Sequence, residues 1–129
     1  MDIINAFLRR KNVLHGTKHT DNEVHSLEKK LGICFSSDYK TYLLEYGTVA
    51  YEGHELTGIS NSKRLNVVDA TERENCDRKQ VINNMYVIEC ANIDGIVFWQ
   101  AEDGKIYRTD YDSEPQFVCD SLSDYVANY

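Results

Sequence analysis

Apolar residues near the start of the chain recur at the spacing of an α-helix. Over residues 3–8 they occupy one helical face, and Asp2 can cap the helix that they predict. A second helix is expected from Thr20, because the run from Thr20 to Glu23 has the composition of a capping box. Its apolar face consists of Val24, Leu27 and Leu31, and Gly32 is expected to end it.

A third helix is predicted to begin at Ser36 or Ser37 and to end at Gly47. Its shared face is aromatic and aliphatic, formed by Tyr39, Tyr42, Leu43 and Tyr46. Between the first two helices, residues 12–19 form a polar, glycine-containing break. The N-terminal third of the chain is therefore expected to be helical.

After Gly47 the pattern changes to the alternation of β-strands. Short strands are expected at 48–51 and 55–59, and residues 65–68 either form another strand or lead into a short helix near 70–75. The clearest signal is a meander of strands at 86–90, 96–100 and 105–109, with Asp-Gly turns between them. A further strand at 116–119 and a terminal helix capped by Ser121 complete the pattern. Helices, a mainly antiparallel sheet and a closing helix predict a single α+β domain over residues 1–129.

The chain of 129 residues carries a net charge of −7, and the acidic excess is uneven. Residues 1–40 have a net charge of +2, residues 41–93 of −3 and residues 94–129 of −6. This balance argues against direct binding to nucleic acid or to an anionic membrane, because both require basic residues. The acidic excess either only keeps the protein soluble or forms a one-sided acidic face that attracts a basic partner.

Neither the N-terminal pattern nor any apolar run has the form of a secretory signal or a membrane span, so we expect a cytoplasmic protein. Four cysteines without a CxxC pair are expected to be reduced and mostly buried. His15, His19 and His25 lack the spacing of a metal site. The sequence also lacks nucleophile and phosphate-binding motifs, so no catalytic residue, metal or cofactor is predicted.

The surface of the C-terminal third is the remaining candidate for function. Aromatic residues lie beside several of its acidic ones, which is the composition of an interface anchor with a charged rim. Trp99 is a candidate anchor, although a tryptophan in a strand is more often a core residue. The residues predicted to bind a partner are Asp94, Trp99, Glu102, Asp103, Asp110, Tyr111, Asp112 and Glu114.

The ordered motifs resemble those of the SUKH superfamily, which contains bacterial toxin-immunity proteins and yeast regulators of cell-wall assembly. Leu31-Gly32 and the run from Ser37 to Gly47 resemble its opening motif, and the segments at 55–59, 66–71, 86–95 and 103–107 resemble its later strands and turns. The segment at 121–126 resembles its closing helix. Two departures are Phe35-Ser36, where Leu-Pro is usual, and Thr48 in place of a second glycine.

This resemblance implies a protein-binding domain without catalytic residues. Its bacterial form would bind and neutralise a cognate toxin, and a nuclease toxin would present the basic surface that an acidic inhibitor fits. One alternative is an intracellular scaffold or regulator of the yeast type. Another is a small enzyme that uses His54 with a nearby carboxylate, which would require His54 to line a sizeable pocket.

Overall fold

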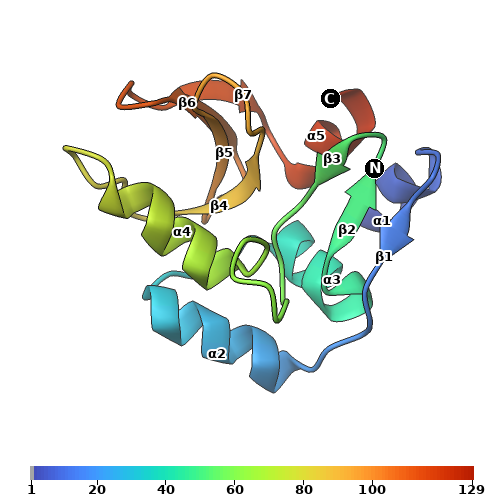
Figure 1. The fold of residues 1–129 in the computed structure, drawn as a ribbon. Coiled ribbons are helices and arrows are strands. Elements are labelled where there is room, and N and C mark those ends of the chain that lie inside the picture. The colour runs from blue at the N-terminus through green and yellow to red at the C-terminus, as the bar shows by residue number, and fades with distance from the viewer. Residues whose placement is uncertain (1) are drawn as a thin grey trace.

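The computed structural model describes residues 2–129 as helices and two small antiparallel sheets (Figure 1). The helices are α1 (Ile3–Leu8), α2 (Asp21–Leu31), α3 (Ser37–Tyr46), α4 (Val67–Cys76) and α5 (Leu122–Asn128). The strands are β1 (Leu14–His15), β2 (Val49–Tyr51), β3 (His54–Glu55), β4 (Met85–Cys90), β5 (Ile96–Ala101), β6 (Ile106–Asp110) and β7 (Gln116–Cys119). The predicted α+β class is confirmed.

Helices α1, α2, α3 and α5 begin where the sequence places their caps. The Asp2 carboxylate accepts a hydrogen bond from the Asn5 amide at 2.8 Å, and Thr20 and Glu23 form a reciprocal capping box at the start of α2. The hydroxyl of Ser36 caps α3 by accepting a hydrogen bond from the Tyr39 amide, and that of Ser121 caps α5 by accepting one from the Asp124 amide. Each cap satisfies amide groups that a helix start otherwise leaves unpaired.

The strands form two separate sheets, one in the order β1-β2-β3 and one in the order β4-β5-β6-β7. The second sheet is the predicted meander, with Trp99 of β5 opposite Tyr107 of β6. The first sheet contains the strands expected at 48–51 and 55–59, both shorter than expected, and its additional strand β1 falls in the segment predicted to be a break. Residues 67–76 form a helix, because the Asn66 side chain accepts hydrogen bonds from the amides of Val68 and Asp69.

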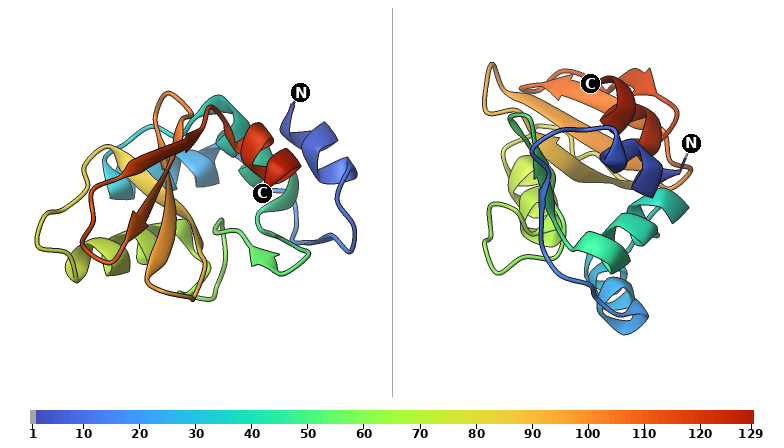
Figure 2. Two further views of the ribbon diagram at one scale, coloured as in Figure 1. Left: turned by 90° about the horizontal axis from the view of Figure 1, so that it is seen from above. Right: turned by 90° about the vertical axis from the view of Figure 1, so that its right-hand side faces the viewer.

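Both faces of the meander are buried against helices. One face contributes Val87, Val97 and Trp99 to a small cluster with Ala70 of α4. The other face contributes to the main core, which α1, α3 and α5 complete. Helices α1 and α5 pack together, so the first and last helices lie side by side (Figure 2). No helix among residues 2–129 is long and apolar enough to cross a membrane.

All four cysteines are free thiols, but the prediction that they are mostly buried is wrong. Cys34 and Cys76 are exposed, and Cys90 and Cys119 are half-buried. Cys34 lies between the buried residues Ile33 and Phe35, yet its own side chain is exposed. Apolar neighbours in the sequence therefore do not place Cys34 in the core.

Candidate partner-binding surface

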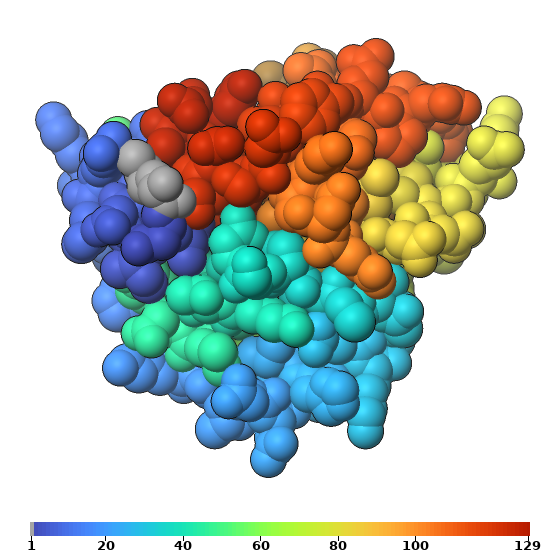
Figure 3. Space-filling model, turned by 180° about the vertical axis from the view of Figure 1, so that it is seen from behind, coloured from blue at the N-terminus to red at the C-terminus, as the bar shows by residue number. Residues whose placement is uncertain are grey.

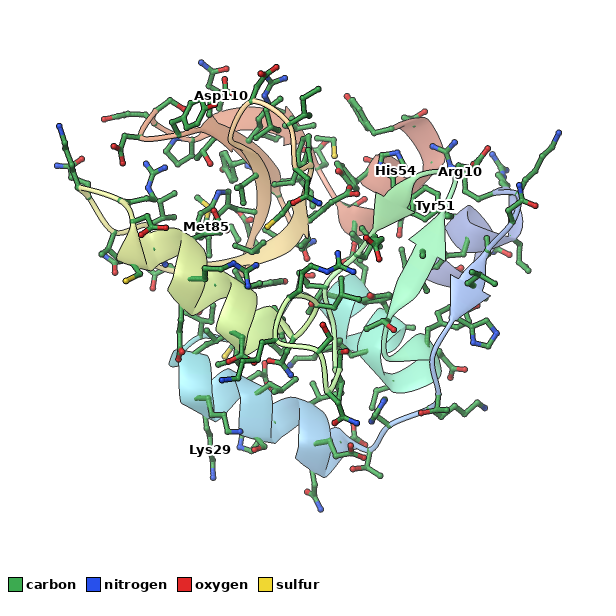
Figure 4. All side chains as sticks on the ribbon, in the orientation of Figure 1. Arg10, Lys29, Tyr51, His54, Met85 and Asp110 are labelled. Carbon is green, nitrogen blue, oxygen red and sulfur yellow. The ribbon has the colours of Figure 1, made fainter. Side chains whose placement is uncertain are left out.

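The predicted partner-binding residues lie at the two opposite ends of the meander rather than on one continuous face. Glu102 and Asp103 are in the turn between β5 and β6. The other acidic residues and Tyr111 flank the turns between β4 and β5 and between β6 and β7. Figure 4 labels Asp110 at this second end, apart from Arg10 and His54. The six residues of β5 separate the two ends by roughly 17 Å, at 3.3 Å per residue.

Trp99 has no exposed surface, so it offers nothing to a partner and its inclusion in the predicted set is wrong. Its indole Nε1 donates a hydrogen bond to the Thr109 hydroxyl at 3.0 Å. The ring packs in the small cluster beneath α4. The strand alternation that paired Trp99 with Val97 is confirmed, and α4 covers the face on which both lie.

The second end carries an exposed aromatic residue among acidic ones. We call this group the Tyr111 surface; its members are Asp94, Asp110, Tyr111, Asp112 and Glu114. Tyr111 is 73% exposed, and all the acids except the half-buried Asp110 are also exposed. Asp110 makes an ion pair with Arg108 of its own strand, at 3.2 Å.

The backbone holds Tyr111 in one conformation. Its φ angle of 51° lies in the left-handed region, which is rare for a residue other than glycine. The Tyr111 ring lies directly over Gly95, where a Cβ atom would be only 2.5 Å from the ring carbon Cδ1. A side chain at position 95 would therefore displace the ring.

Arg78 stabilises the same turn by hydrogen bonds to its backbone. Its guanidinium donates hydrogen bonds to the carbonyls of Tyr111 and Ser113, both at 2.7 Å, and to the carbonyl of Gln80 at 3.1 Å. The Lys79 amide also donates to the Asp112 carboxylate at 3.2 Å. Contacts from the segment after α4 thus hold the backbone of the strained turn, and the Tyr111 ring is exposed to solvent on it.

The carboxylate of Glu89 lies within hydrogen-bond distance of His54, but its hydrogen bonds are all to groups of the protein and serve the fold. Glu89 of β4 is 4% exposed, and its carboxylate accepts hydrogen bonds from the Tyr125 hydroxyl, from His54 Nδ1 at 3.0 Å and from the Glu55 amide at 3.1 Å. Figure 4 shows His54 beside Tyr51, whose ring stacks on it at 4.8 Å between centroids. Sequence reasoning missed Glu89, because its place in the meander resembles that of any polar strand residue.

Among the best-formed surface cavities of the described residues are five of about 220 to 450 Å³, and His54 lines none of these five. An enzyme that uses His54 would need this residue to line a sizeable pocket, and none of these cavities meets that requirement. Of the three early histidines, His19 and His25 contact glutamates of α2, at 2.7 and 3.5 Å. Across residues 2–129, no group of three or more histidine, cysteine or acidic side chains is placed to hold a metal ion.

Comparison with known proteins identifies the family. The full chain, residues 1–129, matches the SUKH_5 family, described as SMI1-KNR4 cell-wall. No curated protein matches the chain. The family match agrees with the order of motifs from the Leu31-Gly32 segment to α5, and with the α+β architecture. The chain is a member of the SMI1-KNR4 family of SUKH domains.

Proposed function

We propose that this SUKH domain is an immunity protein that binds a cognate toxin in stoichiometric amounts and so neutralises it in the cytoplasm. It acts without catalysis, as domains of the family generally do. The partner presents a basic surface, which a nuclease toxin needs for its own substrate. An acidic inhibitor would occupy that surface and compete with the nucleic acid for it.

The observation that carries this proposal is the Tyr111 surface. A tyrosine whose backbone is already held loses less conformational entropy on binding, and tyrosines are among the residues that dominate the energy of many interfaces. The surrounding acids add long-range attraction for a basic partner, which speeds association at low salt. Tyr111 therefore supplies affinity, and the acidic rim supplies rate and selectivity.

The direct test is co-expression with the product of an adjacent toxin gene. We expect protection of the host and a complex of fixed stoichiometry in size-exclusion chromatography with light scattering. If the domain neither binds nor protects, the immunity proposal is wrong. An endogenous partner captured without any protection would instead support a scaffold or regulator.

Two variants test the role of the surface. Tyr111→Ala is expected to weaken toxin binding by more than tenfold, the loss typical of an interface anchor. Glu114→Lys is expected to slow association and to reduce its salt dependence. The matched control is Glu45→Lys near the end of α3, which changes the net charge equally in a part of the molecule that Figure 1 shows away from β6 and β7. This control also removes the exposed ion pair of Glu45 with Lys18, at 3.7 Å. If both lysine variants slow association equally, net charge rather than the Tyr111 surface guides the encounter.

A further inference from the structure

The two edges of the meander differ in how their backbone groups are paired. The strand order leaves β4 and β7 as the edges. The outer side of β4 is occupied, because the Val87 amide donates to the Thr71 hydroxyl at 3.0 Å and the Val87 carbonyl accepts from the Thr57 hydroxyl at 2.8 Å. Among the described residues, only β6 forms hydrogen bonds with the backbone of residues 116–119. Figure 3 shows the orange-red surface of this part of the chain along the upper rim of the molecule. Strand β7 is therefore an open edge, at which a further strand can pair.

Phe117 is the residue of β7 whose backbone groups face outward. In an antiparallel sheet, consecutive residues direct their amide and carbonyl groups to opposite neighbours. The Tyr111 amide donates to the Gly95 carbonyl beside β5, so the odd-numbered residues of β6 bond to β5 and the even-numbered ones face β7. Arg108 is even-numbered and lies opposite Gln116. The amide and the carbonyl of Phe117, the next residue, consequently point away from β6.

This open edge continues the Tyr111 surface. Strand β7 begins two residues after Glu114, a member of that surface. The Phe117 side chain is 56% exposed, and its ring contacts that of Tyr107 edge to face, at 6.0 Å between centroids. An added strand would cover the Phe117 ring and adjoin Tyr111, so one partner segment can contact both aromatic residues.

The charge around β7 selects the occupant. Residues 112–124 contain no lysine or arginine, and their four acidic residues are all exposed: Asp112, Glu114, Asp120 and Asp124. Arg108 of the neighbouring strand is already paired with Asp110, at 3.2 Å. Like charges on paired strands destabilise the pairing and opposite charges stabilise it. The edge therefore repels a second copy of this chain and is complementary to a basic strand.

We infer that β7 accepts an extended, basic segment of the partner protein as a fifth strand of the meander. Pro115 has no amide hydrogen, and Val118 has no partner in the register with β6, so the pairing is short and centred on Phe117. The inference rests on the proposed function only for the identity of the partner, because strand addition itself can be measured with a peptide.

The probe is the peptide acetyl-Arg-Val-Thr-Val-Arg-amide, titrated into the ¹⁵N-labelled protein at constant ionic strength. We expect saturable shifts centred on the Phe117 amide and slower hydrogen exchange at that amide, since the peptide backbone would accept its hydrogen bond. The acidic peptide acetyl-Glu-Val-Thr-Val-Glu-amide should produce neither effect. The basic peptide with its three central residues N-methylated keeps the charge but loses backbone donors, and it should bind about fivefold more weakly or worse.

A pair of variants isolates the outward amide. Phe117→Pro removes the amide hydrogen that faces solvent and leaves the bonds to β6, whereas the matched control Phe117→Ala loses the ring but keeps that hydrogen. We expect the proline variant to bind the basic peptide about fivefold more weakly than the alanine variant, or worse. If the proline variant does not fold, the N-methylated peptide on the native protein decides the question.

The outcomes separate the two proposals. Equal binding of the N-methylated peptide, or shifts that avoid Phe117, would overturn the strand inference. A free protein that is already a dimer with a protected Phe117 amide would also overturn it, since a second copy would then occupy the edge. If the toxin binds Phe117→Pro as tightly as Phe117→Ala, the strand inference fails while the immunity proposal stands. If the peptide adds to β7 but no toxin binds the protein, the immunity proposal fails and the open edge stands as a strand-binding site.

Discussion

Five buried tyrosines should make this protein sensitive to alkali. Tyr39, Tyr42, Tyr51, Tyr86 and Tyr125 are each at most 1% exposed, and burial is the main cause that raises the pKa of each above its ordinary value near 10. The folded state therefore keeps these protons after the unfolded chain has begun to lose them. Stability is complete below pH 10 and is lost as the pH rises from there towards the folded-state pKa values.

The magnitude follows from linkage. A tyrosine with a pKa of 10 in the unfolded chain and a much higher pKa in the fold lowers the free energy of unfolding by about 1.4 kcal/mol at pH 11. Five such residues lower it by about 7 kcal/mol, which is comparable to the entire stability of many domains. We therefore expect cooperative unfolding near pH 11, accompanied by the 295-nm absorbance of about five newly formed tyrosinates.

Tyr51→Phe isolates one of the five contributions. The Tyr51 hydroxyl is buried without a hydrogen-bond partner among residues 2–129, so its removal should leave stability at pH 7 unchanged or increase it by about 1 kcal/mol. The loss of stability between pH 10 and 11 should shrink by about 1 kcal/mol. Urea unfolding at fixed pH values measures both quantities. The control is Tyr111→Phe at an exposed site; an equal effect of the two variants, or no decline above pH 10, would refute the reasoning.

Three other measurements probe the buried groups. Burial raises the pKa of Cys119 to about 11, so at pH 8 its thiolate population should be about 200-fold lower than that of an ordinary thiol. Mass spectrometry after brief alkylation should therefore find the exposed Cys34 and Cys76 modified before Cys119. Glu89→Gln should lower the free energy of unfolding by about 2–4 kcal/mol, as seen in urea titrations, because the Glu55 amide would lose its charged acceptor. Trp99→Ala should cost about 3–5 kcal/mol through the cavity that it leaves, and retained stability would contradict the buried position of the indole.

Local chemistry made the helices and the meander predictable. The caps at Asp2, Thr20, Ser36 and Ser121 act within three residues along the chain, and the Asp-Gly turns act within four. The short strand β1 was missed, because its two residues form a strand only by pairing with β2, more than 30 residues away. A short strand that forms only by pairing with a distant strand is difficult to predict from its own residues.

The candidate site was only partly predictable for the same reason. The acidity of the C-terminal third is a property of the sequence, and it identified Tyr111 together with its acidic neighbours. The sequence could not show that Glu102 lies at the opposite end of the sheet. It also could not show that Asp2 and Asp38, from the less acidic N-terminal third, join Glu102 around one pocket.

The sequence by itself determined the class of fold, the starts of α1, α2, α3 and α5, the order of the meander and the sign of the charge. These depend on contacts between near neighbours in the chain or on composition. Only the tertiary structure decided which side chains reach the surface and which acids share a site. It buried Trp99 beneath α4, exposed Cys34 between two core residues and paired Glu89 with His54. Packing between distant segments sets these positions, since each side chain must fill the space that the others leave.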